Sequence, residues 1–158
     1  MPIHIGHRAE RLRRRLTILQ EKCVAPSIRI VYFKTCLNAW ITERRMASFA
    51  EARTLEGCPF CERGKDSIEH FAVCKECLPL FCRHNLRFGG LINFLGLYQE
   101  AYWQPAILIR VAKVLSILYL VHNTFLHTLP ADRHALRPCV LINAAELNAF
   151  RMNAGYHA

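Results

Sequence analysis

Four residues that commonly bind metal ions stand close together near the middle of the chain. Two residues separate Cys58 from Cys61, and three separate His70 from Cys74. A two-residue turn can aim both sulfurs at one point, and residues four apart lie on one face of a helix. The spacing therefore predicts a closed Cys-Cys-His-Cys site, a ligand set typical of structural Zn²⁺.

Cys77 is an alternative fourth ligand. With Cys58, Cys61 and Cys74 it forms a C-x2-C-x12-C-x2-C pattern, which is also typical of zinc sites. On one helix, His70, Cys74 and Cys77 would all face the same way. The residues alone therefore leave the fourth ligand open between His70 and Cys77.

The N-terminus bears on the chemistry of these thiols. Residues 1–15 are rich in arginine but lack the apolar run of a secretory signal. We therefore expect an intracellular chain with reduced cysteines, which bind metal more readily than they form disulfides. The expected cofactor is Zn²⁺.

Hydrophobic periodicity predicts a mainly α fold, a helical bundle-like region with a small zinc-binding module. Helices are expected over residues 8–23, 29–50, 67–77 and 144–152, although residues 30–33 and 91–97 could be extended. The second helix is expected from apolar residues at three- and four-residue spacing: Ile30, Phe33, Leu37, Trp40 and Ile41. The chain divides into a basic helical region (1–50), a zinc-binding module (51–87) and a C-terminal helical region (88–158).

Residues 105–127 form the longest apolar segment and are long enough to span a bilayer. Polar residues nevertheless recur in it every three or four positions, among them Arg110, Lys113 and Asn123. We therefore expect an amphipathic helix that packs on the core, with no membrane span.

The whole chain has a formal net charge of +9. The excess of positive charge is concentrated at the start of the chain. Such an excess favours an acidic partner, nucleic acid first and an anionic membrane second. Contact would be through phosphates. The candidate residues lie in the first helix and just before the zinc turn: Arg11, Arg13, Arg14, Arg15, Arg44 and Arg45.

One stretch of sequence resembles a known family. The residues are Leu37-Asn-Ala-Trp40, Thr42, Arg44-Arg45, Cys58-Pro-Phe-Cys61 and Asp66-Ser-Ile-Glu-His70-Phe-Ala-Val-Cys74. They resemble the zinc-binding region that follows the polymerase domain in non-LTR (LINE-type) retrotransposon reverse transcriptases. The resemblance implies the ligand set Cys58, Cys61, His70 and Cys74, which favours His70 over Cys77. It also implies binding of RNA or DNA, association with a polymerase domain and a nuclear location.

The chain departs from that family in its catalytic residues. It has two aspartates, Asp66 and Asp132, and lacks the paired aspartates of a polymerase centre. The resemblance therefore implies a non-catalytic fragment, with residues 1–50 as a remnant of the polymerase thumb or connection.

Two other functions compete with this interpretation. A zinc-dependent enzyme could use Glu69 as its base, but zinc deaminases place His-x-Glu before Pro-Cys-x2-Cys, and here the order is reversed. A zinc-stabilised interaction module could use residues 105–127 to contact a protein or a membrane.

Overall fold

The computed structural model describes residues 4–46, 55–97 and 104–151, and they are mainly helical, with no strand among them. This confirms the predicted fold class. In chain order the elements are α1 (His4–Glu21), α2 (Pro26–Cys36), α3 (Glu43–Met46), α4 (Ile68–Phe71), α5 (Leu78–Arg83), α6 (Leu91–Phe94), α8 (Pro105–His127), the 3-10 helix η1 (Pro130–Ala135) and α9 (Pro138–Arg151).

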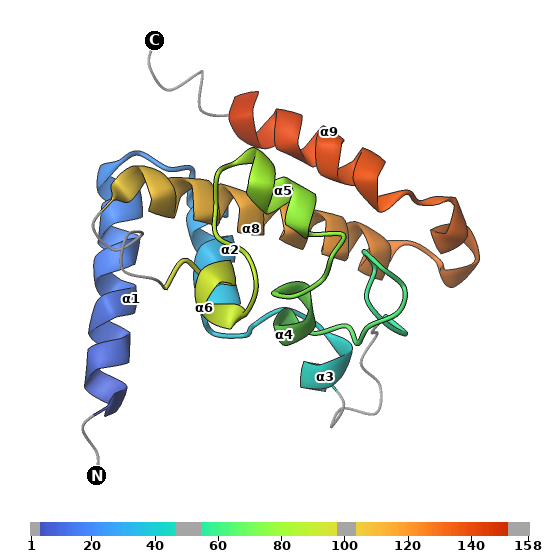
Figure 1. Cartoon of the computed structure of the whole chain (residues 1–158), viewed down its shortest axis with the longest axis horizontal. Helices are drawn as coiled ribbons and strands as arrows, with labels where there is room; N and C mark the ends of the chain where they lie inside the picture. The colour runs from blue at the N-terminus through green and yellow to red at the C-terminus, as the bar shows by residue number, and fades with distance from the viewer. Residues whose placement is uncertain (1–3, 47–54, 98–103, 152–158) are drawn as a thin grey trace.

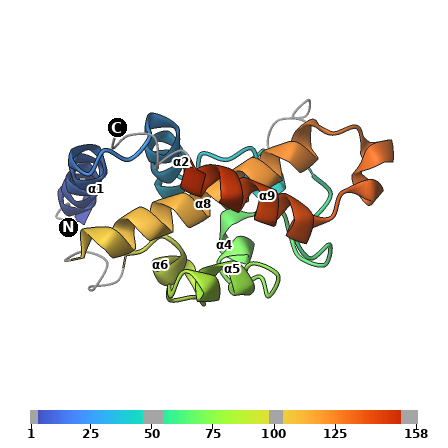
Figure 2. The ribbon, with the colours of Figure 1, turned by 90° about the horizontal axis from the view of Figure 1, so that it is seen from above.

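Helix α8 crosses the middle of the molecule, and the other long helices pack around it (Figures 1 and 2). It contacts α1, α2 and α9, and α1 also contacts α2. Its 23 residues contain no glycine, and proline occurs only at the first position, where its missing N–H costs no helical hydrogen bond. Leu108, Leu115 and Leu118 are fully buried along it. We call α1, α2, α8 and α9 the helical scaffold.

By length and composition α8 is the one described helix that could cross a membrane, with a mean hydropathy of 1.6 in its most apolar window. In the folded chain 56% of that window is buried. The expected polar stripe is only partly exposed, since Lys113 is buried while Arg110 and Asn123 are half-buried. The helix thus packs on the core as expected, and the absence of a membrane span stays a prediction.

The helix expected over residues 29–50 is wrong, because α2 ends at Cys36 and α3 begins only at Glu43. Asn38 takes a left-handed conformation, with a φ of 50°. The resulting turn folds Trp40 back into the core, where its Nε1–H donates a hydrogen bond to Thr35 Oγ1 at 2.9 Å. The burial of Trp40 offsets the cost of breaking the helix.

The residues whose spacing predicted this helix do not form the buried face of α2. Ile28, Val31 and Tyr32 are the apolar residues of α2 that are buried. Ile30 and Phe33 are exposed instead, as is Leu37 just beyond the helix. Periodicity could not separate the two faces, since both are rich in apolar residues.

The helix expected over residues 67–77 is a single turn, α4, which ends at Phe71. The chain then makes further turns before α5 begins at Leu78. Cys74 therefore lies in a turn beyond α4.

Candidate metal centre

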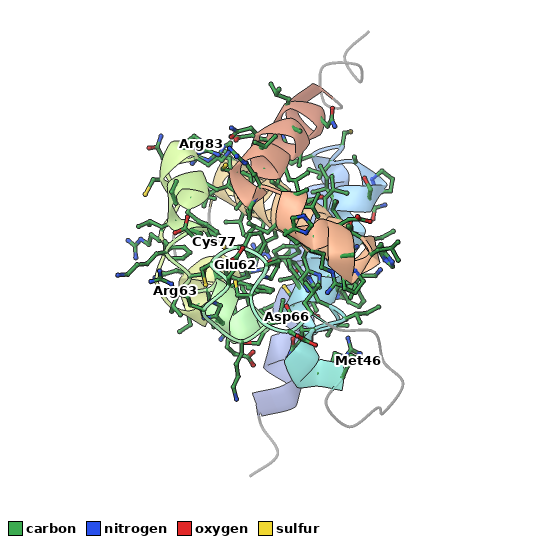
Figure 3. The ribbon with its side chains drawn as sticks, turned by 90° about the vertical axis from the view of Figure 1, so that its right-hand side faces the viewer. Met46, Glu62, Arg63, Asp66, Cys77 and Arg83 are labelled. Carbon is green, nitrogen blue, oxygen red and sulfur yellow. The ribbon has the colours of Figure 1, made fainter. Side chains whose placement is uncertain are left out.

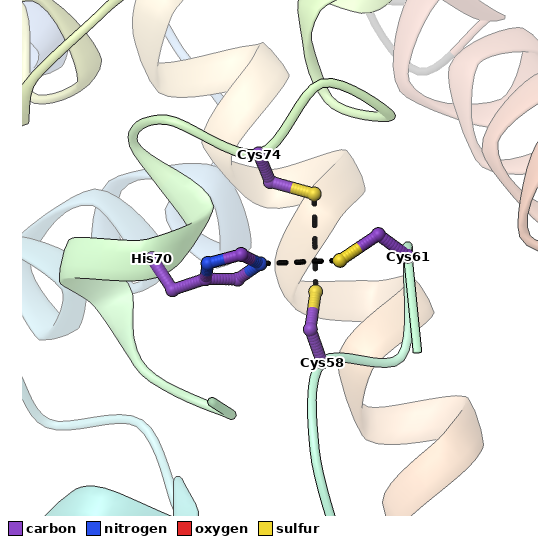
Figure 4. A group of neighbouring side chains, drawn as sticks. All are labelled: Cys58, Cys61, His70 and Cys74. Atoms are coloured by element: carbon purple, nitrogen blue, oxygen red, sulfur yellow. Dashed lines mark hydrogen bonds between the residues drawn. The ribbon is translucent and has the colours of Figure 1, made fainter. Parts of the chain in front are cut away.

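Four potential ligand atoms gather at one point, as Figure 4 shows. The Sγ atoms of Cys58, Cys61 and Cys74 and a ring nitrogen of His70 all lie within 4.8 Å of one another. The Sγ atoms of Cys58 and Cys74 are 3.9 Å apart, and Cys61 Sγ lies 3.2 Å from His70 Nε2. Zn–S bonds of about 2.3 Å in a tetrahedral site place two sulfurs about 3.8 Å apart. The cluster could therefore hold a metal ion.

The first two cysteines are positioned by a tight loop. The Cys58 N–H donates to the Gly64 carbonyl oxygen at 2.8 Å, and the Glu62 N–H donates to the Cys58 carbonyl oxygen at 2.9 Å. Glu62 adopts a φ of 60°, the left-handed conformation that lets the chain reverse after Cys61. Both sulfurs consequently point to the same side of the loop, as the two-residue spacing predicted.

The second pair of ligands follows a capped turn. Ser67 is the N-cap of α4, and its Oγ accepts a hydrogen bond from the His70 N–H at 3.1 Å. Cys74 reaches the site through a turn, with its N–H donating to the Phe71 carbonyl oxygen at 3.4 Å. The predicted pairing of His70 and Cys74 is thus present, but through a turn and not along one helix face.

Cys77 lies beside the group of four and outside it. It is completely buried, and its backbone N–H donates to the Cys74 carbonyl oxygen at 3.0 Å. A hydrogen bond to the Cys74 thiol, together with burial, raises the pKa of Cys77 well above its ordinary value. Since His70 provides a ligand atom within the group, the geometry favours His70 as the fourth ligand.

The pKa values of two thiols in the cluster are shifted in opposite directions. Hydrogen bonds from Cys58 and Cys77 lower the pKa of Cys74, and the Glu76 N–H acts in the same direction. The hydrogen bond to Cys74, followed by burial, raises the pKa of Cys58. Because metal ligation requires thiolates, loading the site would release protons.

Gly64 leaves space for the histidine ligand. A Cβ built on Gly64 would lie only 2.0 Å from His70 Cε1 and 2.2 Å from its Nε2. Real side chains do not approach so closely, so any larger residue would displace the imidazole. Sequence patterns gave no sign of this role, because a glycine in a loop usually indicates only a turn.

Aromatic packing connects the cluster to α8. Phe60 and Phe71 are buried with an edge-to-face contact, their ring centroids 5.3 Å apart, so they belong to the core of the module. Phe71 also contacts His122 of α8, whose ring centroid is 5.8 Å away. His122 Nε2–H donates to Asp66 Oδ1 at 3.0 Å, and both side chains are fully buried. This pair fixes the metal loop to the scaffold.

The predicted nucleic-acid-binding arginines divide into different environments. Arg11, Arg13 and Arg14 are exposed on α1, and Arg13 forms an ion pair with Glu10 at 2.9 Å. Arg15 is only 3% exposed and donates to the Tyr32 hydroxyl at 3.1 Å. The prediction that Arg15 contacts phosphates is therefore corrected: it is a buried structural residue, because it faces α2.

Arg44 and Arg45 lie in α3, on the approach to the metal loop. Arg45 is exposed, and its backbone N–H donates to Thr42 Oγ1 at 3.4 Å. The side chain of Arg44 lies outside the described residues. Three exposed cations of the metal loop, Arg63, Lys65 and Lys75, had not been predicted as candidates. They were not considered because residues 51–87 have a net charge of zero, which drew attention to the more basic start of the chain.

Comparison with known proteins leaves the family open. No family model, no curated protein and no solved structure matches this chain. The functional argument therefore depends on the geometry of the site and on the distribution of charge.

Proposed function

We propose that the cluster binds Zn²⁺ as a structural ion. Three thiolates and one imidazole form a soft donor set that suits zinc, and hard cations such as Mg²⁺ prefer oxygen ligands. Cys58, Cys61, His70 and Cys74 supply four donor atoms, and such a set would fill a tetrahedral zinc shell and leave no position for a catalytic water. This closed set of four protein ligands is the observation that carries the proposal. When bound, the ion would cross-link a loop that has little regular structure of its own.

X-ray absorption on the purified chain tests this assignment. We expect one zinc per chain, with three sulfur and one nitrogen neighbour and bond lengths of about 2.3 and 2.0 Å. An oxygen neighbour in place of a protein ligand would contradict a closed site and would favour the zinc-dependent enzyme. A shell of four sulfurs would replace His70 by Cys77.

We further propose that the chain is a non-catalytic, nucleic-acid-binding region of a reverse transcriptase-like protein, of the non-LTR retrotransposon type. The exposed Arg11, Arg13 and Arg14 of α1 support phosphate binding. The non-catalytic role is supported by the scarcity of aspartate and by Asp66, which is buried against His122. In this proposal the region acts inside the nucleus, beside a polymerase domain, and zinc holds its loop in register.

Fluorescence anisotropy with labelled single-stranded RNA and DNA of mixed sequence tests the second proposal. We expect binding that weakens steeply with salt, with a slope of log K against log[salt] of about −0.7 for each phosphate contacted. Undetectable binding at low ionic strength, or an affinity independent of salt, would contradict it.

A further inference from the structure

An apolar row remains uncovered on the outer side of α2. Ile30 is 54% exposed and Phe33 is 40% exposed, and the row ends at Leu37, the C-cap of the helix, which is 54% exposed. The opposite face of α2 packs against α8, with Ile28 and Tyr32 almost completely buried. A short helix with large apolar side chains on both faces indicates a second contact, which residues 4–46, 55–97 and 104–151 do not supply.

We propose that this row binds an amphipathic helix of a protein partner, whose apolar seam is flanked by acidic residues. Ile30, Phe33 and Leu37 are spaced three and four apart, which is the a, d, a spacing of a helix-pairing seam. In that register Arg29 occupies position g and Lys34 position e. These two positions lie beside the seam and select the charge of the partner helix.

The segment that carries the row has charges of one sign. Residues 22–42 contain no aspartate or glutamate, and their charged residues are Lys22, Arg29 and Lys34. Lys34 Nζ lies 3.3 Å from the Tyr119 hydroxyl and 5.5 Å from the centroid of that ring. This contact holds the ammonium group close to α8 at the edge of the row. Glutamate or aspartate at the facing positions of a partner would complement Arg29 and Lys34.

The same charges argue against a second copy of this chain as the partner. Two α2 helices packed on each other would bring the basic flanks of one against the basic flanks of the other, in either orientation. The form of the row argues against a bilayer surface, since a membrane-bound helix usually presents a broad apolar face. On α2 this row has a basic residue at each flanking position, Arg29 and Lys34, as in the seam between two helices.

A designed peptide provides the probe. The zinc-loaded 158-residue chain, labelled with ¹⁵N, is titrated with a helical peptide of about three heptads that carries Leu at a and d and Glu at e and g. We expect chemical-shift changes centred on residues 27–41, with an affinity in the micromolar range or weaker because the contact is small. A matched peptide with Lys at e and g should bind about tenfold more weakly.

Paired variants separate a specific contact from a general effect of charge. Ile30→Asp with Leu37→Asp should weaken binding of the acidic peptide by about tenfold or more. The control is Val140→Asp with Leu147→Asp on α9, where the side chains are similarly exposed at 58% and 60%. It adds the same two negative charges and should change the affinity by about twofold or less. The chemical-shift spectrum also shows whether each variant folds.

Four results would overturn the proposal. The first is no binding of the acidic peptide, and the second is equal binding of the acidic and basic peptides. The third is sedimentation showing self-association that Ile30→Asp with Leu37→Asp abolishes, which would assign the row to a second copy. The fourth is binding through this row to phosphatidylcholine vesicles with about 30% phosphatidylserine, without binding of the peptide, which would assign it to lipid.

Discussion

The metal module, residues 57–78, and the helical scaffold are stabilised in different ways. The scaffold helices α1, α8 and α9 have 18, 23 and 14 residues, and a continuous apolar cluster surrounds α8. In the module, α4 has only four residues, and most of the remaining backbone forms turns and bends. A helix of one turn is not stable by itself. The scaffold therefore depends on distributed burial of apolar side chains, whereas the module combines a small apolar core with the zinc cross-link that we propose.

Loss of the metal ligands should produce the largest difference in stability between the module and the scaffold. Structural zinc contributes on the order of 10 kcal/mol to the folding of small modules. We expect Cys58→Ser with Cys74→Ser to remove amide-exchange protection from residues 57–78. Protection in α8 should persist, as measured by hydrogen exchange with mass spectrometry.

Cys139→Ser is the matched control, since Cys139 is exposed on α9 and lies outside the cluster. It should leave exchange unchanged in both regions. A chelator added to the unmodified chain should reproduce the effect of the double variant. Full protection of residues 57–78 after metal removal would mean that apolar packing alone holds the module.

Truncation of a buried scaffold side chain should have the opposite result: the fold loses stability and the module keeps its metal. Leu108 is fully buried near the N-terminal end of α8, the end that lies beside α1 in Figure 1. Leu108→Ala should lower the free energy of unfolding by about 2–5 kcal/mol, through lost burial and the resulting cavity. The zinc content of the folded variant should remain at one per chain. Urea unfolding followed by circular dichroism measures the first quantity, and metal analysis measures the second.

Leu120→Ala is a control in the same helix, because Leu120 is 51% exposed. It should cost about 1 kcal/mol or less. If Leu108→Ala instead released the metal, the two regions would unfold as one unit, coupled through Asp66 and His122.

Gly64→Ala should weaken metal binding and should change the scaffold less than it changes the metal site. The new Cβ would overlap the His70 imidazole, so the ligand would have to move. Disturbance of a group that positions a ligand typically lowers metal affinity by about 10- to 100-fold. Competition with a chromophoric chelator measures this loss. Lys65→Ala, an exposed change in the same loop, is the control, and an equal loss in both variants would refute the steric explanation.

The sequence was informative where the relevant contacts are local. Spacing identified Cys58, Cys61 and Cys74 as ligands, because Cys58 and Cys61 share one turn, and it left the fourth ligand open between His70 and Cys77. Figure 3 labels Glu62 and Arg63, which follow Cys61 in the loop. The long helix α8 followed from a long, mainly apolar segment with no glycine and no internal proline.

Features that depend on distant contacts were missed. Arg15 belongs to a basic run, yet it is buried because Tyr32, 17 residues later, accepts its hydrogen bond. Trp40 breaks the helix predicted over residues 29–50 to reach a core built partly by Tyr119 of α8. The bond between Asp66 and His122 joins residues 56 positions apart. No spacing rule includes such partners, because tertiary packing decides them.

Single arginine variants test whether the scaffold or the module contacts nucleic acid. Of all the variants, these should have the smallest effects, measured as changes in the salt dependence of RNA binding. Arg11 is exposed on α1, Arg63 is exposed in the metal loop, and Arg137 is exposed where α9 begins. We expect Arg11→Ala to reduce the salt slope for single-stranded RNA by about 0.7, the value of one phosphate contact. Arg137→Ala removes the same charge and should leave the slope unchanged. Loss of slope in Arg63→Ala but not in Arg11→Ala would move the interface to the metal module. Equal small losses in all three would indicate only the effect of net charge, because a specific surface contacts phosphates at fixed positions.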